Sequence, residues 1–250
     1  MDWVKTFYEA QNEWFGVYLG PVEESHRERA LLLNKMTDSS AKKVLELGAG
    51  GGQTAIALAE LGHEVSMIEL LEESVWHAQK LSHQMKVEIA IQQGDFYTFA
   101  YKEQFDLICY FDSFGIGTDE DQRNLLRRMA AWLKPNGSIV IEVGATWYWA
   151  GIANGRTMDL GACFRQYNFD VLEARLVDSW WRKDDPNTVV RQFLRCYTPV
   201  DFQLLLEGTG LQLMDIQAGG RVDYEQMEFI KEANLEEAMT YYVKLSKEDI

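Results

Sequence analysis

The stretch that decides the fold is Val44-Leu45-Glu46-Leu47-Gly48-Ala49-Gly50-Gly51-Gly52. An apolar strand that ends in a glycine-rich turn and enters a helix is typical of α/β proteins that receive a small polar ligand at the turn. Glycines at positions 48, 50, 51 and 52 let the backbone turn tightly and come within contact distance of a ligand, which a Cβ would obstruct. The stretch therefore predicts the first strand and the ligand loop of an α/β fold.

Beyond this loop, apolar segments of strand length alternate with segments of helical periodicity. That order favours a doubly wound, mostly parallel sheet with helices on both faces. The pattern predicts strands at 43–47, 64–68, 86–92, 105–111, 138–143 and 211–217, and helices at 53–61, 72–85, 119–133 and 200–208. A Lys-Pro-Asn-Gly turn at 134–137 separates the third of these helices from its strand.

Two segments depart from this alternation. Residues 146–198 are rich in Trp and Tyr, and the period-two runs 176–181 and 189–197 flank a turn at 183–187. Such a pair predicts an inserted antiparallel hairpin. The tail 224–250 has a partly helical, amphipathic pattern.

Composition and charge limit the class of protein. The chain has 250 residues, of which 47% are hydrophobic, enough for one large core. No apolar run approaches the ~20 residues of a membrane span, and the first residues lack the basic and then apolar order of a secretory signal. We therefore expect a cytoplasmic protein without membrane contact. A net charge of −15 disfavours nucleic-acid partners, because their binding depends on Lys and Arg.

The cysteines carry no ligand pattern. Cys109, Cys163 and Cys196 are far apart and odd in number, so the sequence indicates neither a disulfide framework nor a metal site. We expect three buried thiols.

The glycine loop resembles motif I of the class I S-adenosylmethionine-dependent methyltransferases. A nicotinamide-binding loop of the form Gly-x-Gly-x-x-Gly would need glycine at Gln53, and the register from Gly50 ends at Ala55, a looser variant. The resemblance implies a Rossmann-like sheet of seven strands, S-adenosylmethionine as cofactor and S-adenosylhomocysteine as product. It also implies one domain over 1–250, with a helical cover at 1–40, a cofactor-binding core at 42–145, a substrate-lid insertion at 146–198 and completion of the sheet at 199–250.

Landmarks of that family recur at successive strand ends. In the family, the carboxylate at the place of Glu46 lies near the methionine amino group, and an acidic residue at the place of Glu69 binds the ribose hydroxyls. Asp95-Phe96 matches the acidic and apolar pair that contacts adenine. The resemblance thus implies these cofactor-binding residues: Glu46, Gly48, Ala49, Gly50, Gly52, Glu69, Leu70, Asp95, Phe96, Tyr110 and, from the N-terminal cover, Tyr18.

The acceptor is expected beside the fourth strand's exit. Asp112 there is similar in position to the Asp-Pro-Pro-Tyr motif of amino-methylating enzymes, with Ser113 in place of the first proline. Asp112 and Tyr148 are the candidate catalytic residues. Aromatic side chains of the N-terminal segment and the insertion are the candidates for binding the acceptor: Tyr8, Trp14, Trp147, Trp180 and Trp181.

The resulting hypothesis is methyl transfer to a small-molecule acceptor by in-line displacement. All four histidines lie in the first third of the chain and no metal motif is evident, which favours nitrogen over oxygen or carbon as the methylated atom. Two alternatives stay open: a nicotinamide-dependent oxidoreductase and a non-catalytic S-adenosylmethionine-binding module. The oligomeric state does not follow from the sequence.

Overall fold

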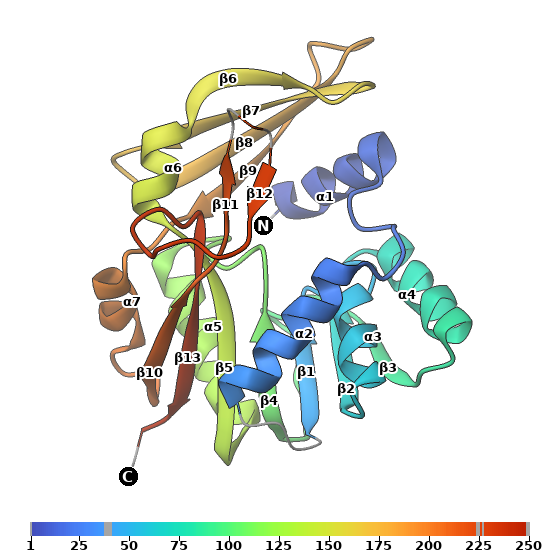
Figure 1. Ribbon diagram of the computed structural model, residues 1–250, viewed down its shortest axis with the longest axis vertical. Coiled ribbons are helices and arrows are strands. Elements are labelled where there is room, and N and C mark those ends of the chain that lie inside the picture. The colour runs from blue at the N-terminus through green and yellow to red at the C-terminus, as the bar shows by residue number, and fades with distance from the viewer. Residues whose placement is uncertain (1, 38–41, 224–225, 227, 249–250) are drawn as a thin grey trace.

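A seven-stranded sheet forms the centre of the computed structural model, which describes residues 2–37, 42–223, 226 and 228–248 (Figure 1). Its strand order is β10-β13-β5-β4-β1-β2-β3. Five neighbouring strands are parallel, and β13 runs antiparallel to β5 and β10. The strands are β1 (Lys43–Leu47), β2 (Glu64–Glu69), β3 (Ile89–Gln93), β4 (Phe105–Tyr110), β5 (Leu133–Gly144), β10 (Leu211–Ala218) and β13 (Thr240–Lys247). The predicted mostly parallel sheet of seven strands is confirmed.

Helices cover both faces because the buried strands are apolar on both sides. In β1, Leu45 and Leu47 face one hydrophobic cluster and Val44 faces the other. The first cluster takes in α5 (Asp119–Trp132) and α7 (Pro199–Leu206), and the second takes in α2 (Glu24–Thr37) and α3 (Gln53–Glu60). The remaining helices are α1 (Asp2–Phe15), α4 (Glu72–Met85) and α6 (Thr146–Ile152).

Two strands begin at other residues than the sequence predicts. The third strand begins at Ile89 rather than 86, because Lys86 ends α4 in the left-handed conformation (φ 57°). The strand predicted at 138–143 is part of the longer β5. Its pairing with β4 jumps from Leu133 to Ser138, so the predicted turn at 134–137 is an irregularity inside this strand.

The insertion is larger than the predicted hairpin. It forms a four-stranded antiparallel sheet of β6 (Asn154–Asp159), β7 (Cys163–Asp170), β8 (Arg175–Arg182) and β9 (Val189–Arg195). The predicted hairpin is present as the antiparallel pair of β8 and β9. The strands β6 and β7 were not predicted, because their residues show no clear alternation of buried and exposed positions. Figure 1 shows this second sheet above the central one, with α1 beside it.

The prediction of a partly helical tail was wrong within the described residues. Residues 228–230 form β12 (Glu228–Ile230), which pairs with β11 (Arg221–Asp223), and 240–247 form β13. In β13, Tyr241, Val243 and Leu245 are fully buried at period two, because the strand is enclosed between β5 and β10. Residues 224, 225, 227, 249 and 250 of the predicted segment lie outside the described residues.

The two N-terminal helices lie in different places: α2 packs against one face of the central sheet, and α1 lies beside the insertion sheet (Figure 1). α2 packs on α3, and α1 contacts β9 through an edge-to-face pair of Trp3 and Phe193, with ring centroids 5.8 Å apart. The three cysteines are buried and free, as expected. No helix within the described ranges is both long and apolar enough to cross a lipid bilayer.

Candidate active site

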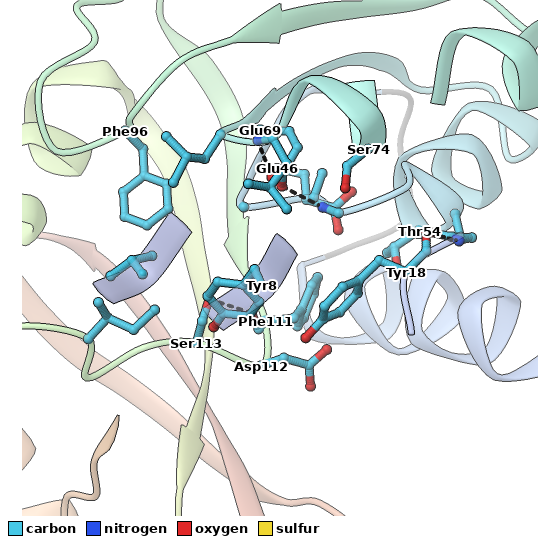
Figure 2. Close-up of a pocket in the computed structure, with 18 of the residues that line it drawn as sticks. Tyr8, Tyr18, Glu46, Thr54, Glu69, Ser74, Phe96, Phe111, Asp112 and Ser113 are labelled. Carbon is cyan, nitrogen blue, oxygen red and sulfur yellow. Dashed lines mark hydrogen bonds between the residues drawn. The ribbon is translucent and has the colours of Figure 1, made fainter. Parts of the chain in front are cut away.

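A cavity opens where the carboxyl ends of β1, β2 and β4 meet the N-terminal segment. It encloses about 1080 Å³, its open mouth included. Eleven residues predicted for the site line it: Tyr8, Tyr18, Glu46, Gly48, Ala49, Gly50, Glu69, Leu70, Asp95, Phe96 and Asp112. Figure 2 shows Phe96 and Tyr18 at opposite ends of this group, with Tyr8, Phe111 and Asp112 between them.

The glycine loop shapes one wall of the cavity. Gly48 and Gly50 have φ angles of 61° and 54°, in the left-handed region that favours glycine. A Cβ on Gly50 would lie 3.1 Å from the Tyr18 ring, and one on Gly51 would lie 2.0 Å from the Tyr18 carbonyl oxygen. The glycines therefore admit the N-terminal segment to the cavity wall. Gly52 does not line the cavity; it precedes α3, and its Cβ would meet Ala78 at 2.8 Å.

Glu46 places an unpartnered carboxylate oxygen at the cavity. The residue is 4% exposed, and its Oε2 has no hydrogen-bond partner. Burial raises the pKa of Glu46 to about 8, although the charge of Arg29 works in the opposite direction. A buried carboxylate is costly without a partner, so this oxygen fits a ligand that brings a positive charge or a donor.

Glu69 links the end of β2 to the glycine loop. Its Oε2 accepts from Gly50 N at 2.8 Å, and its Oε1 accepts from Leu71 N at 2.9 Å. Burial raises the pKa of Glu69, and these backbone donors counteract part of the rise. A carboxylate has about four acceptor positions, so both oxygens can still accept hydroxyl groups of a ligand.

Asp95 and Phe96 lie at the far end of the cavity. Asp95 Oδ1 accepts from Tyr97 N at 2.8 Å, and the Phe96 ring meets the Tyr110 ring edge-on at 5.1 Å. Tyr110 is fully buried and does not line the cavity; its hydroxyl donates to the carbonyl oxygen of Ser113 at 2.8 Å. An acceptor beside an aromatic face suits a flat ring that carries an amino group.

An ionic cluster borders the cavity at the end of β4. The Arg29 guanidinium lies 4.8 Å from the centre of the Phe111 ring, 3.6 Å from Asp112 Oδ2 and 3.7 Å from Glu142 Oε2. Glu142 Oε1 accepts from Thr240 Oγ1 at 3.0 Å and from the Tyr242 hydroxyl at 3.2 Å. Burial raises the pKa of Glu142 to about 7.

Asp112 has a backbone conformation that is unusual for a residue other than glycine. Its φ is 62°, and its N–H donates to Glu142 Oε2 at 3.3 Å. The Asp112 side chain is 56% exposed and reaches the cavity. Backbone strain of this kind persists where surrounding contacts enforce it, and it is frequent at functional sites.

Besides Gly52 and Tyr110, five predicted site residues lie outside the cavity lining. Trp147 stacks on Tyr241 with centroids 5.7 Å apart, and the Tyr148 hydroxyl donates to the carbonyl oxygen of Val222 at 3.4 Å. Trp180 is 1% exposed and packs in one cluster with Trp14, whereas the Trp181 ring lies 5.8 Å from Phe164. These contacts join the insertion to its neighbours, so the structure does not bring these five residues together with the cofactor-site candidates.

Sequence reasoning missed Glu142 and did not select Arg29 or His26. Arg29 and His26 both line the cavity, and His26 Nδ1 accepts from Glu23 N at 3.0 Å. Burial, followed by the charge of Arg29, lowers the pKa of His26. The available signal for Glu142 was a lone acidic residue inside the otherwise apolar run 139–143. Among the described residues, no group of three or more His, Cys, Asp or Glu side chains is arranged to hold a metal ion.

Comparison with known proteins relates part of the chain to one family. Residues 44–137 match the methyltransferase domain family. An uncharacterized methyltransferase of Staphylococcus carnosus is 26% identical over 110 residues, which make up 44% of this chain and 51% of that protein. The match thus spans about half the length of this curated relative.

Solved structures share the fold over nearly the whole chain. The CcbJ methyltransferase from Streptomyces caelestis is 20% identical with a TM-score of 0.72, and the match covers 96% of this chain and 95% of that one. The glycopeptide N-methyltransferase MtfA is 18% identical with a TM-score of 0.61, covering 89% and 90%, and has also been solved with S-adenosylmethionine.

Residues 44–137 thus carry a methyltransferase domain, and the chain shares the fold of S-adenosylmethionine-dependent methyltransferases. The domain match confirms the predicted methyltransferase family over these residues. The shared fold agrees with the predicted enzyme class and with S-adenosylmethionine as cofactor, and the nicotinamide alternative is set aside. The cavity fits this cofactor, because the unpartnered Glu46 oxygen suits the methionine ammonium and the oxygens of Glu69 retain acceptor capacity.

Proposed function

We propose that this protein methylates an amine nitrogen of a small molecule. The observation that carries the proposal is the excess of acidic groups in the cavity, where the described lining residues include four carboxyl groups, Glu46, Glu69, Asp95 and Asp112, against one arginine, Arg29. An anionic acceptor would meet repulsion there, whereas a protonated amine would be attracted. A charge of −15 on the whole chain adds a long-range preference for cations.

Four side chains would hold the cofactor. Glu46 would pair with its ammonium, Arg29 with its carboxylate, Glu69 with the ribose hydroxyls and Asp95 with the adenine amine, beside the Phe96 ring. When bound, S-adenosylmethionine supplies an electrophilic methyl group on sulfur, which a nitrogen lone pair displaces in line. The protein's own residues then have to bind the amine, align it and exclude water.

Asp112 is the residue proposed to receive the amine. Its carboxylate is half-exposed in the cavity, and its backbone is held by the hydrogen bond to Glu142. It can orient the amine as a cation and then accept the proton that nitrogen loses, which leaves the lone pair free for attack. If Arg29 turns toward the cofactor carboxylate, Asp112 loses part of its present counter-charge, and its attraction for a cationic acceptor increases.

Aromatic side chains would enclose the acceptor. Tyr8, Tyr18 and Phe111 face the space beside Asp112 in Figure 2. Aromatic faces attract ammonium groups and keep water out, and both effects favour methylation of an amine. The similarity to a glycopeptide N-methyltransferase agrees with nitrogen as the target, and the cavity size agrees with a small acceptor.

The test begins with calorimetric titration of S-adenosylmethionine, S-adenosylhomocysteine and NAD, followed by turnover assays on matched panels of amines and phenols. We expect binding of the first two ligands and turnover of amines. Asp112→Asn should reduce amine turnover by about 10²-fold or more, as expected for a lost general base, and leave S-adenosylhomocysteine binding intact. Asp215→Asn is the control, because Asp215 lies on β10, outside the cavity lining.

Three results would change the proposal. Turnover of phenols alone would shift the methylated atom to oxygen. Full amine turnover by Asp112→Asn would remove this carboxylate from the mechanism. Tight cofactor binding without turnover of any acceptor would support the remaining alternative, a non-catalytic binding module.

A further inference from the structure

The insertion sheet holds the loop that follows β4. This loop, 112–117, brings Asp112, Ser113 and Ile116 to the cavity. Ile116 forms an isolated antiparallel bridge with Leu194 of β9, and the backbone N–H of Arg195 donates to the carbonyl oxygen of Gly115 at 3.0 Å. The insertion therefore reaches the cavity through a backbone segment.

Arg175 is the side chain that fixes this contact. Its Nη2 donates to the carbonyl oxygen of Gly117 at 2.7 Å, and its Nη1 lies 3.5 Å from that of Gly115. One guanidinium thus spans two carbonyl groups of the loop from a residue of β8. The planar fork of arginine suits such a double contact, whereas lysine offers a single charged nitrogen.

The loop backbone is shaped to meet this clamp. Gly115 and Gly117 have φ angles of 112° and 89°, which side chains disfavour. A Cβ on Gly115 would lie 2.2 Å from the carbonyl oxygen of Arg195. On the other side of the loop, the Tyr97 hydroxyl donates to the carbonyl oxygen of Ile116 at 2.6 Å. The loop is therefore held between the insertion and the core.

We propose that Arg175 is a positioning residue for methyl transfer: by clamping Gly115 and Gly117 it holds Asp112 and Ser113 in place against the bound cofactor and acceptor. Arg175 does not line the cavity, so it acts only through the loop. The proposal rests on the proposed function for its catalytic consequence. It also gives the insertion a part in the reaction, although none of the insertion's tryptophans lines the cavity.

The experiment compares Arg175→Met, Arg175→Lys and Gly115→Ala with the control Arg191→Met. Arg191 is an exposed arginine on β9 of the same sheet. Four readouts are needed: kcat and KM for the amine, affinity for S-adenosylhomocysteine, hydrogen exchange of the loop amides at 113–117, and the melting temperature. Gly115→Ala disrupts the same contact from the loop side, so it separates the clamp from the charge of Arg175.

We expect Arg175→Met to lower kcat by about 10²-fold, the size of a misplacement of about 1 Å, with unchanged affinity for S-adenosylhomocysteine. Loop exchange should become faster, Arg175→Lys should recover part of kcat, and Gly115→Ala should follow Arg175→Met. If the loop exchanges faster while kcat stays at the wild-type value, the positioning role is overturned. If loop exchange is unchanged, the clamp itself is overturned. Hydrogen exchange is measured without turnover, so it tests the clamp even if no amine is methylated. Failure of the clamp can therefore be distinguished from failure of the proposed function.

Discussion

At the residue scale, Glu46 makes the stability of the ligand-free protein depend on pH. Its pKa is raised to about 8 by burial, so the folded protein keeps a proton that the unfolded chain releases near pH 4.5. Between these two values the free energy of unfolding must fall as pH rises, because the folded state binds more protons.

Glu46→Gln should therefore stabilise the ligand-free protein in alkaline solution. At about pH 8.5 we expect a gain of order 2 kcal/mol, since each pKa unit is worth about 1.4 kcal/mol and local relaxation reduces the full effect. Near pH 5 the gain should be much smaller. Scanning calorimetry at both values checks this, with Glu88→Gln, an exposed residue, as the control. Equal gains at both pH values would contradict the raised pKa.

The same carboxylate should make cofactor binding pH-dependent. An ammonium favours the ionised form of Glu46, so binding should release a proton and strengthen as pH rises toward about 8. We expect the affinity for S-adenosylhomocysteine to rise by up to about tenfold per pH unit in this range. Titration in two buffers of different ionisation enthalpy measures the released proton. Glu46→Gln should abolish the release, and a release that persists would place the proton on another group.

Cavity residues could be predicted from the sequence only where a local pattern marks them. Glu46, Glu69 and Asp95 could be predicted to line one site, because each lies at or next to the carboxyl end of a strand. The cluster of Arg29 and Glu142 could not, because it joins a helix and a strand more than a hundred residues apart. No local sequence pattern indicates a contact between residues so far apart in the chain.

At the element scale, an ion pair between a buried aspartate and a partly buried arginine stabilises the insertion sheet. Asp178 of β8 is fully buried and accepts from Arg165 Nη2 at 2.7 Å and Nε at 3.0 Å. The Arg165 guanidinium lies 4.4 Å from the Tyr167 ring centre and 4.9 Å from that of Trp180. Loss of Asp178 would leave the partly buried Arg165 guanidinium among aromatic rings without its counter-charge.

Asp178→Ala should destabilise the protein by about 3–5 kcal/mol, the usual cost of breaking a buried pair. The melting temperature should fall by roughly 6–20 °C, given about 2–4 °C per kcal/mol for a chain of this size. Thermal unfolding measures the change. The double variant Arg165→Met with Asp178→Leu should recover much of the loss, because it removes both charges. If the single variant melts like wild type, the pair has no net role.

Elements with strong local signals were predictable, and elements made by distant pairing were not. The helix α7 begins at Thr198-Pro199, where Thr198 and Asp201 form a capping box, and the sequence places it nearly correctly. β6 and β7 were missed because their residues show no clear alternation and pairing with neighbouring strands makes them strands. β13 does alternate, with Tyr241, Val243 and Leu245 buried, and the prediction of a partly helical tail overlooked that pattern. Period-two patterning is clear only where one face is buried and the other exposed.

At the scale of the whole molecule, the cavity is shared between the sheet and the N-terminal segment. Val4, Tyr8 and Tyr18 line it from one side, and Gln53 Nε2 donates to the carbonyl oxygens of Tyr18 and Gly20 at 2.9 and 3.0 Å. A ligand in the cavity must contact both parts, so it should stabilise their association.

S-adenosylhomocysteine should therefore slow amide exchange in two separate regions. We expect protection in 46–54 and 69–74, and also in 4–20, because the N-terminal segment closes the same cavity. Hydrogen exchange with mass spectrometry measures this protection. The edge strand β10, which β13 and β5 separate from β4 in the sheet, serves as the internal control. Protection limited to the strand ends would show that the N-terminal segment does not close over the ligand.

The place of β13 has a consequence for how the chain is made. β13 lies between β5 and β10, although it follows both of them in the chain. During synthesis β1 to β5 emerge from the ribosome long before β13, so the backbone groups at the edge of β5 stay unpaired in that interval. A nascent chain with an open sheet edge is prone to pair with other chains, which makes the interval before β13 emerges the period when this protein most needs a chaperone.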